Sequence, residues 1–457
     1  MTYQERLRQN ISTRAKIIAV LTLVQSGQSL SALLDGLLSA VPAQDKGFAH
    51  ELTLGTLRQW WALCRVSESL VEGEIDDVVL SALNVGLYQL LYLQTPDYAT
   101  IFATVEALKE LGEPRAGGLV NAILRKVAKT PAKFAKKVQK NHSLPNWLAK
   151  TLKQDWAEYY DALGQTLRTS APIFVRANVS KISHDEYKNL LINQGFEFDE
   201  VAIDTQVFDK EYTTQAFKIH QGNVQNLPKF DDGFVAVQDL HAQISAAIID
   251  GVMARLSKNS LQLLDACTAP AGKLTHWLAH LQAFHVKHGD YQMTAIDSDE
   301  KRLVRVFDNV ERLGFGELLG KNLTIKTADA TTFTSDKPFD VVVLDAPCTA
   351  TGVIRRHPDI ALLRSELDVI QTADLQEKIL ENLWQSVADG GYLLYITCSI
   401  LKQENEAQLE KFLAKHADAA EIKLDGDWGI AQTIGRQILP VLNGGDGFYY
   451  ALLHKRS

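Results

Sequence analysis

The chain has 457 residues, which at roughly 150 residues per domain indicates about three domains with real hydrophobic cores. Apolar residues make up 46% and charged residues 22%, with only 28 Gly and 12 Pro, so disordered, collagen-like and low-complexity classes are excluded. The net charge of −8 argues against a protein that coats nucleic acid indiscriminately.

No stretch of the sequence predicts a membrane span. The uncharged run 17–34 is interrupted by the polar residues 25–29 and falls short of the roughly 18 to 20 apolar residues that a span needs. We expect a buried helix at 17–24 rather than a secretory signal, and we interpret the N-terminus as mature sequence. The four cysteines lie far apart without a CxxC motif, which is typical of a reducing compartment, so the expected location is the cytoplasm.

The charge is distributed unevenly. Residues 1–153 hold 18 Lys and Arg against 13 Asp and Glu, so the basic side chains are concentrated in the first third of the chain. The stretch 114–153 holds ten of these basic residues and no acidic one. Such a stretch is equally typical of a solvated helix face and of a surface that contacts phosphates.

The first part of the chain is predicted to be helical, because apolar residues recur every three or four positions over 14–127. Pro131 and the lysines after it mark a boundary, and another helix begins near Pro145. Between 172 and 234 the pattern changes to strands at 173–178 and 196–198 around a helix at 185–194, which predicts a small α+β insert.

After Gln238 short apolar runs alternate with helical stretches, which predicts a doubly wound parallel sheet. The predicted strands are 261–266, 293–296, 323–325, 341–344 and 392–396, and the helix after the second of them ends at Gly314. In such a sheet a ligand binds beyond the carboxyl ends of the strands.

Carboxylates follow three of these strands. The first strand leads into the small-residue turn 265–273, which lacks the G-x-G-x-x-G pattern; Asp297 ends the second strand and Asp329 follows the third. One such carboxylate alone is more typical of a helix cap. Three at successive strand ends favour a nucleoside pocket in which an acid accepts hydrogen bonds from a ribose diol.

Two thiols follow the next two strands. The fourth strand ends in Asp345 and leads to Cys348, and the fifth leads to Cys398. A lone cysteine is most often a small buried hydrophobe, but here two of them come after neighbouring strands and beside polar residues. A metal site is disfavoured because no His and Cys pair has ligand spacing.

Four motifs in this half resemble those of the S-adenosylmethionine-dependent RNA cytosine-5 methyltransferases. They are Asp265-Ala266-Cys267-Thr268-Ala269-Pro270-Ala271-Gly272-Lys273, Asp345-Ala346-Pro347-Cys348, the run 350–360 and Thr397-Cys398-Ser399. The runs 118–125, 237–239 and 445–450 narrow the resemblance to the bacterial ribosomal RNA enzymes of the RsmB (Sun/Fmu) type, whose N-terminal domain is similar to the NusB RNA-binding fold. The resemblance covers nearly the whole chain.

The resemblance implies three domains. They are a NusB-like all-α RNA-binding domain at 1–140, linker helices with a small α+β RNA-binding subdomain at 141–232, and a Rossmann-like methyltransferase domain at 233–457. It also implies methyl transfer to carbon 5 of a specific cytosine in small-subunit (16S) ribosomal RNA through a covalent Cys–cytosine intermediate. The expected protein is a monomer that acts on unassembled or partly assembled ribosomal RNA, with no membrane and no metal.

The resemblance also assigns roles to residues. Cys398 matches the nucleophile, Cys348 matches the second cysteine that helps to release the product, and Asp345 lies between the cofactor and the base. S-adenosyl-L-methionine is the implied cofactor, with Asp297 at its ribose, Asp329 at its adenine and Asp345 also in contact. Its methionine end is assigned to the turn made by Cys267, Thr268, Ala269, Pro270, Ala271, Gly272 and Lys273.

Two positions depart from the family pattern. Ala271 stands where the family usually has Gly, and a methyl group there crowds the cofactor or opposes a positive φ angle. His241 replaces a common small Ser. The catalytic cysteines and acids remain, so we interpret both departures as variation.

The chemistry explains why these residue types are needed. Carbon 5 of cytosine is a poor nucleophile, so a thiolate must first add to carbon 6 and create an enamine that attacks the sulfonium methyl. A second group must then remove the carbon-5 proton before the cysteine leaves, and Cys348 or a water that it positions is the candidate. Asp345 is a candidate to hold the amino edge of the base. The base must be unpaired or flipped out, and Arg355, Arg356 and His357 are candidates to grip the adjoining backbone, or else members of an exposed loop ion pair.

Other functions remain open from the sequence alone. The same chemistry fits transfer RNA or another RNA, and the fold fits a non-catalytic RNA-binding assembly factor. The absence of G-x-G-x-x-G disfavours a nicotinamide-dependent dehydrogenase. A DNA cytosine methyltransferase needs only the cysteine after Pro347 and leaves Cys398 unexplained.

Overall fold

The computed structural model describes all residues except 1, 141, 221, 257, 259 and 289, and it does not describe the side chains of 284–288. The chain forms two compact units. The helical unit comprises 1–170 together with 353–366, and the sheet unit comprises 171–352 together with 367–457. Within the described residues, none of the helices combines the length and the apolar character that a membrane crossing requires.

The helical unit is built around α2 (Thr13–Gln25), whose residues from Ala15 to Val24 are all buried. This helix packs against α3, α4, α6 and α7. A helix that is mainly apolar on all sides is a core helix, because only full enclosure removes its whole surface from water, and the polar groups of Lys16 and Thr22 are satisfied by the backbone carbonyls of Ala40 and Ile18. The other helices are α1 (Tyr3–Arg6), α3 (Leu30–Ala40), α4 (Lys46–Arg58), α5 (Trp60–Glu68), α6 (Asp77–Tyr88), α7 (Asp97–Glu110), α8 (Gly117–Ala128), α9 (Pro131–Lys140), α10 (Asn146–Asp155) and α11 (Tyr160–Thr166).

A short segment from the second half of the sequence belongs to this unit. The chain enters it at Val353, and α16 (Ile360–Leu363) packs against α2. Side chains of the helical unit hold the segment by its backbone: Arg58 Nε donates to Arg355 O at 2.8 Å and Trp61 Nε1 to Ala361 O at 3.0 Å. No local pattern predicts that 353–366 belongs to the helical unit, because the contacts join residues about 300 positions apart.

The small insert forms an antiparallel sheet in the order β11-β2-β3-β1-β4. Helix α12 (His184–Asn193) lies against it, with Tyr187 and Leu191 buried in its core. The strands are β1 (Ile173–Ala177), β2 (Phe198–Val207), β3 (Lys210–Ile219), β4 (Val235–Val237) and β11 (Leu424–Gly426). The predicted strand at 196–198 was wrong in extent, because the real hairpin runs to residue 219 with exposed charged and polar residues that weaken its apolar signal.

The second sheet carries the doubly wound core. Its order is β12-β13-β14-β9-β8-β5-β6-β7, with β10 paired to β14, and β5 to β9 are parallel. The parallel strands are β5 (Ser260–Ala266), β6 (Asp290–Asp297), β7 (Leu323–Thr327), β8 (Phe339–Asp345) and β9 (Val387–Thr397). The five predicted strands are thus confirmed, and the antiparallel additions are β10 (Ala419–Ile422), β12 (Ile430–Ala431), β13 (Arg436–Ile438) and β14 (Phe448–Lys455).

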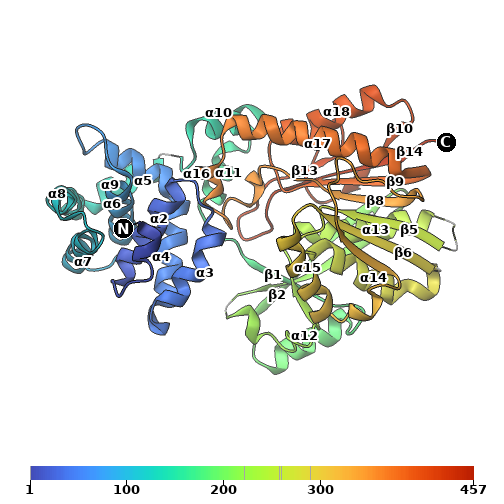
Figure 1. The fold of residues 1–457 in the computed structure, drawn as a ribbon, viewed down its shortest axis with the longest axis horizontal. Helices are drawn as coiled ribbons and strands as arrows, with labels where there is room; N and C mark the ends of the chain where they lie inside the picture. The colour runs from blue at the N-terminus through green and yellow to red at the C-terminus, as the bar shows by residue number, and fades with distance from the viewer. Residues whose placement is uncertain (1, 141, 221, 257, 259, 289) are drawn as a thin grey trace. The chain divides into compact units, whose positions relative to one another are not determined.

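Helices cover both faces of this sheet (Figure 1). One face packs against α13 (Ile244–Arg255), α14 (Gly272–His288) and α15 (Glu300–Arg312), and the other against α17 (Glu366–Ser386) and α18 (Glu406–Lys415). Alternate strand residues feed the two cores, with Leu263 and Val343 on one face and Leu264 and Val342 on the other. The predicted class, an all-α N-terminal part, an α+β insert and a Rossmann-like sheet, is confirmed.

Candidate active site

The candidate residues gather where the order of the sheet reverses. Strand β5 lies between β6, which follows it in the chain, and β8, so the crevice at its carboxyl end is the switch point of the sheet. The turn after β5 approaches β6 closely: the Thr268 N–H donates to Ile296 O at 3.0 Å and the Ala269 N–H to Asp297 Oδ2 at 3.1 Å. Ala271 in this turn has a φ of +79°, so the residue that departs from the family pattern does occupy the left-handed region.

Two carboxylates at this edge are buried. Asp265 is 1% exposed, and burial raises its pKa to about 7, although the Thr268 hydroxyl donates to it at 2.5 Å and opposes the shift. Asp297 is 2% exposed and also accepts from the Asp299 N–H at 3.1 Å, with Arg302 Nη1 3.6 Å away. Buried carboxylates need such donors because water no longer reaches them.

Asp329 differs from these two because it is exposed. Its Oδ1 accepts from both the N–H and the hydroxyl of Thr331 at 2.8 Å, and these hydrogen bonds lower its pKa. It follows β7, which pairs with β6 on the side away from β5. Asp329 therefore lies at the outer side of the strand-end crevice.

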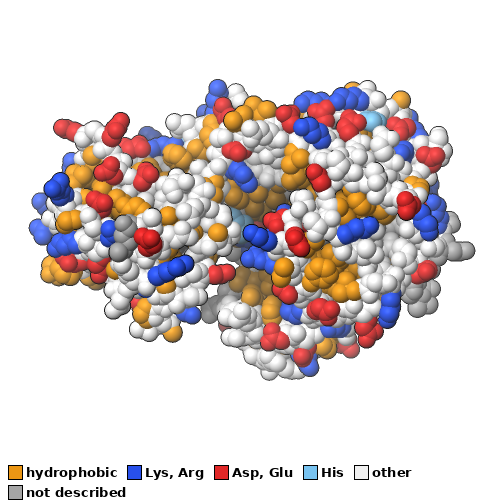
Figure 2. All heavy atoms as spheres, viewed as in Figure 1, with side chains coloured by type: hydrophobic (Ala, Val, Ile, Leu, Met, Phe, Trp, Pro, Cys, Tyr) orange, Lys and Arg blue, Asp and Glu red, His pale blue; other side chains and the backbone are white. Residues whose placement is uncertain are grey.

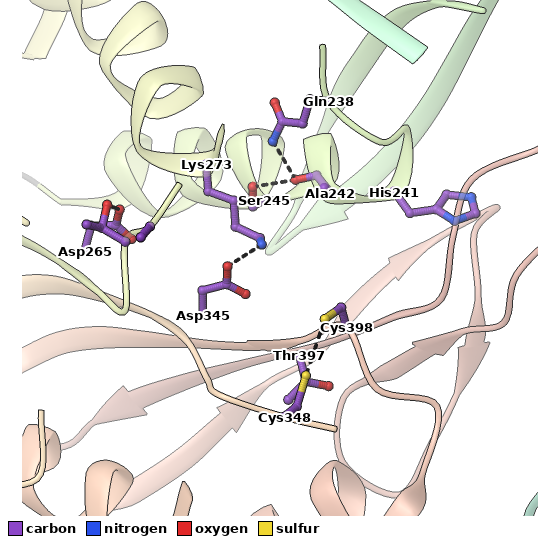
Figure 3. Close-up of polar contacts among 12 residues, drawn as sticks. Gln238, His241, Ala242, Ser245, Asp265, Lys273, Asp345, Cys348, Thr397 and Cys398 are labelled. Carbon is purple, nitrogen blue, oxygen red and sulfur yellow. Dashed lines mark hydrogen bonds and ion pairs between the residues drawn. The ribbon is translucent and has the colours of Figure 1, made fainter. Parts of the chain in front are cut away.

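Lys273 reaches from the first turn of α14 to the end of β8 (Figure 3). Its Nζ lies 2.6 Å from Asp345 Oδ2 and 5.3 Å from the centre of the Phe448 ring. Burial alone lowers the pKa of Lys273, but the charges of Asp345 and Cys398 and the hydrogen bond to Asp345 outweigh it and raise the pKa. The ammonium group therefore stays charged beside the thiols.

The two predicted cysteines are brought together. Cys348 Sγ and Cys398 Sγ are 3.4 Å apart and face one another in Figure 3. The hydrogen bond with Cys398 and burial raise the pKa of Cys348 well above its ordinary value. Burial and the neighbouring sulfur therefore keep Cys348 a neutral thiol near neutrality, and either sulfur can donate in the contact between them.

Several residues that the sequence analysis missed tie the two cysteine turns to each other. Glu404 in the short helix Lys402–Glu404 accepts hydrogen bonds from Thr349, which follows Cys348, and from Ser399, which follows Cys398. The Gly352 N–H donates to Cys398 O at 2.9 Å, and a Cβ at Gly352 would lie 2.7 Å from that oxygen. The hydroxyl residues beside each cysteine were visible in the sequence, but nothing there indicated their common partner.

The third cysteine of the sheet unit behaves differently. Cys267 packs against the core under the sheet, and burial raises its pKa to about 12. A thiol with such a pKa is inert near neutrality. Cys267 therefore contributes to the turn as a small side chain.

The interpretation of Arg355 as a residue that grips an RNA backbone is corrected. Its side chain is fully buried in the helical unit, so it is not available on a surface. His357 is exposed and Arg356 is partly buried in the same segment. The three consecutive basic residues are typical of an exposed loop, and the sequence does not show that Arg355 is buried when this segment packs into the helical unit.

His241, the second position that departs from the family pattern, does not contact the Lys273–Asp345 ion pair in Figure 3. Its Nδ1 lies 2.6 Å from Asp446 O, and its ring points away from Lys273 and Asp345 in Figure 3. Among the residues that the structure describes, no group of three or more His, Cys, Asp or Glu side chains has an arrangement that would hold a metal ion.

Three stretches of the chain match known protein families. Residues 253–454 match the family described as 16S rRNA methyltransferase RsmB/F, residues 12–129 match the NusB family, and residues 144–208 match a RsmF/B-like ferredoxin-like domain. Ribosomal RNA small subunit methyltransferase B of Serratia proteamaculans is 35% identical over 96% of this chain and 97% of its own length. The protein of the same name from Pseudomonas putida is 35% identical over 97% of this chain and 99% of its own length.

The chain belongs to the ribosomal RNA small subunit methyltransferase B family. It is therefore an S-adenosylmethionine-dependent RNA methyltransferase. The fold is shared with the crystal structure of PH0851 (TM-score 0.73, 21% identity, 98% of this chain and 100% of that one). It is also shared with NSun6 from Pyrococcus horikoshii with SFG (TM-score 0.54, 20% identity, 69% and 99%).

The side chains at the switch point fit the cofactor of this family. The carboxylates of Asp265, Asp297 and Asp345 are hydrogen-bond acceptors, and they suit the hydroxyl and ammonium groups of S-adenosylmethionine, which are donors. The turn also leaves room, since a Cβ at Gly272 would have no atom within 4 Å.

Proposed function

We propose that this protein methylates carbon 5 of a cytosine in small-subunit ribosomal RNA, with Cys398 as the nucleophile. The observation that carries the proposal is the pair of sulfurs 3.4 Å apart beside the Lys273–Asp345 ion pair. A single thiol serves many reactions, but two in contact at the ends of adjacent strands match a reaction that adds a sulfur and later removes a proton. The names of the curated relatives favour small-subunit ribosomal RNA as the substrate.

The residues at the switch point are proposed to hold S-adenosylmethionine, which supplies the activated methyl group. Asp297 would accept from the ribose hydroxyls, and Asp329 would lie at the adenine on the outer side of the crevice. The turn of Cys267, Thr268, Ala269, Pro270, Ala271, Gly272 and Lys273 would hold the methionine end. Asp345 would contact both the cofactor and the base.

Cys398 is proposed to attack carbon 6 of the cytosine. The attack needs a thiolate, and two neighbours would favour the negative charge: the Cys348 thiol lies 3.4 Å away, within reach to donate to it, and the Lys273 ammonium lies close by. The electron pair of the 5,6 double bond would then form the bond from carbon 5 to the methyl group, while the methyl–sulfur bond of the bound sulfonium breaks and leaves its electrons on a neutral thioether. Asp345, held by Lys273, is placed to accept a hydrogen bond from the amino group of the base.

Cys348 is proposed to act in the release of the product. After methyl transfer the carbon-5 proton leaves, either to a water that Cys348 positions or to Cys348 once its own proton has passed to solvent, and the electrons of the broken carbon–hydrogen bond restore the 5,6 double bond. The bond between carbon 6 and Cys398 breaks in the same step, which returns the thiolate. Two sulfurs with separate roles are therefore needed, one to bond with the ring and one to handle the proton.

The helical unit is proposed to bind the RNA. A groove of about 600 Å³ is lined by residues of α7 and α8 and by Lys129 after α8. Its lining includes the rings of Tyr98 and Phe102, the cations Lys109, Arg125 and Lys129, and the carboxylates Asp97 and Glu106. Tyr98 is 77% and Phe102 55% exposed, and the two rings stack at 6.1 Å. Figure 2 shows basic and apolar side chains next to one another over α7 and α8. Exposed aromatic rings beside cations are suited to unpaired bases and their phosphates.

The domains, partners and location are proposed as follows. The functional domains are 1–140, 141–232 and 233–457, and a monomer acts on unassembled or partly assembled ribosomal RNA in the cytoplasm. The cysteines are free thiols, and a pair at 3.4 Å is prone to oxidation, so the chemistry favours a reducing compartment.

The test is methyl transfer from labelled cofactor to purified RNA. The protein is incubated with deproteinised 16S ribosomal RNA, with small subunits and with transfer RNA, and the methylated position is identified by bisulfite sequencing and by mass spectrometry of nucleosides. We expect 5-methylcytidine at a single position of 16S ribosomal RNA. A methyl group on another atom of the base would contradict the proposal, and so would methylation of transfer RNA without methylation of 16S ribosomal RNA.

A further inference from the structure

Glu404 is a buried carboxylate at the point where the two cysteine turns meet. It ends the short helix Lys402–Glu404, between the turn of Cys398 and helix α18, and its exposed fraction is 0%. Burying a carboxylate is unfavourable unless donors replace the lost water. The free energy needed to remove the Glu404 carboxylate from water must therefore be offset by hydrogen bonds, and the donors of those bonds indicate what the carboxylate does.

The donors come from both turns. One oxygen of Glu404, Oε1, accepts from the Thr349 N–H at 2.7 Å. The other, Oε2, accepts from the Thr349 hydroxyl at 2.6 Å and from the Ser399 hydroxyl at 2.5 Å. Since Thr349 follows Cys348 and Ser399 follows Cys398, one carboxylate joins the chain next to one sulfur to the chain next to the other.

The backbone around Glu404 is fixed as well. The Tyr395 hydroxyl donates to Glu404 O at 2.8 Å, and the neighbouring Asn405 donates to Ser399 O at 2.9 Å. A second contact between the Cys348 turn and the Cys398 turn is made by the hydroxyls of Thr351 and Ser399, which lie 3.1 Å apart. Glu404 is thus held on β9 and its following turn, and the Cys348 turn is the part that its carboxylate ties down.

We propose that Glu404 is a positioning residue whose carboxylate clamps the Cys348 turn to the Cys398 turn and so sets the distance between the two sulfurs. The inference deepens the proposed function, because the clamp matters for methyl transfer only if both sulfurs take part. Glu404 itself does not touch the base or the cofactor in this scheme. Its role is to keep the proton-handling sulfur within reach of the carbon that Cys398 has attacked.

The charge of Glu404 acts in the same direction. The hydrogen bond with Cys398 and burial are the larger causes of the raised pKa of Cys348, and the negative charge of Glu404 adds to them. A buried anion beside Cys348 disfavours a second thiolate there, while Lys273 stands near Cys398. The clamp therefore also helps to keep the two sulfurs chemically different.

The experiment measures the sulfur pair directly and then the reaction. Phenylarsine oxide binds two thiols only when they lie close together, so its affinity for the full-length protein reports the distance without any RNA or cofactor. The variants are Glu404→Ala, which removes the clamp, and Glu404→Gln, which keeps its shape and removes its charge. Thr349→Val removes one donor, and Glu410→Gln removes an exposed charge from α18 as the matched control.

We expect Glu404→Ala to bind phenylarsine oxide at least tenfold more weakly than the parent protein, with Glu404→Gln and Thr349→Val between the two. We expect kcat for methyl transfer to fall about 100-fold in Glu404→Ala, while KM for S-adenosylmethionine changes less than twofold. Glu410→Gln should match the parent protein in both measurements.

The outcomes separate this inference from the proposed function. Unchanged arsenical affinity and kcat in both Glu404 variants would overturn the clamp, and so would a loss that appears only in KM for the cofactor. If Glu404→Ala fails to fold, Glu404→Gln and Thr349→Val carry the test. If the parent protein methylates no RNA, the proposed function fails, while the arsenical affinities still decide whether Glu404 sets the sulfur distance.

Discussion

Each unit buries charges of both signs, such as Asp359 in the helical unit and Arg176 in the sheet unit, but the buried charges have different roles in the two units. In the helical unit, Lys16 and Arg58 are buried cations that donate to the backbone carbonyls of Ala40 and Arg355. In the sheet unit, the carboxylates of Asp265, Asp297 and Glu404 are buried together near the carboxyl ends of β5, β6, β8 and β9. Buried cations that satisfy carbonyls hold a fold together, whereas several buried anions next to thiols shift pKa values and prepare a reaction.

The comparison teaches where each property of the enzyme resides. Changes in the strand-end crevice should lower kcat and leave RNA affinity nearly unchanged. Changes on the surface of the helical unit should lower RNA affinity and leave the chemical step nearly unchanged.

The largest effect is expected for Cys398→Ala. Without the sulfur no bond to carbon 6 forms, so methyl transfer should fall by at least about 10⁴-fold, while RNA and cofactor affinity stay within about twofold. Radiolabel transfer and filter binding measure the two properties. Cys64→Ala, which changes a buried thiol of the helical unit, is the control and should retain activity. Substantial transfer by Cys398→Ala would refute the assignment of the nucleophile.

Cys348→Ala should lower turnover by about 10²- to 10⁴-fold, because loss of a proton acceptor slows release of the product. The covalent protein–RNA adduct should then accumulate and appear as a slow band in denaturing gels. The double variant Cys348→Ala with Cys398→Ala should show no adduct. An active Cys348→Ala enzyme without any adduct would remove the second cysteine from the mechanism.

Lys273→Met should lower kcat by about 100-fold, since it removes the cation that holds Asp345 and lies near Cys398. Single-turnover rates at saturating RNA and cofactor measure the effect. Lys258→Met, which breaks an ion pair with Asp340 elsewhere in the sheet unit, is the matched control. Equal rates for the two variants would contradict a role for the Lys273 charge.

Tyr98→Ala should weaken RNA binding by about 1–3 kcal/mol, because a base loses its stacking partner. Arg125→Ala and Lys129→Ala should each reduce the slope of log affinity against log salt by about 1. Fluorescence anisotropy with labelled RNA at several salt concentrations measures both. Lys337→Ala, an exposed cation of the sheet unit, should leave the slope unchanged. If Tyr98→Ala lowered kcat but left RNA affinity unchanged, RNA binding would not be a separate property of the helical unit.

The smallest effect is expected for Ala271→Gly. Glycine removes the strain of a φ of +79°, worth about 1–3 kcal/mol, but it also removes a buried methyl group worth about 0.8 kcal/mol. We expect the free energy of unfolding to rise by about 1 kcal/mol in urea titrations. Ala266→Gly, in strand β5, should lower it instead. A loss of stability in Ala271→Gly would show that the turn is not strained.

Much of the sheet unit was predictable because its signals are local. Each parallel strand is a short apolar run with a polar residue at its end, and parallel strands bring their carboxyl ends to one edge. This rule predicts from the sequence alone that Asp297, Asp345, Cys348 and Cys398 lie at or just after strand ends, as they do in the structure. It did not find the hairpin that runs to residue 219, because exposed strands carry few apolar residues.

The sequence by itself determined the classes of the elements and the residue types at the strand ends, since periodicity and turn residues are written along the chain. Only the tertiary structure decided that Arg355 is buried in the helical unit and that Glu404 joins the two cysteine turns. The contacts of Glu404 with Thr349 cross 55 residues, and those of Arg58 with Arg355 cross 297. Such pairs depend on how whole elements pack, and no local pattern along the chain records which of them meet.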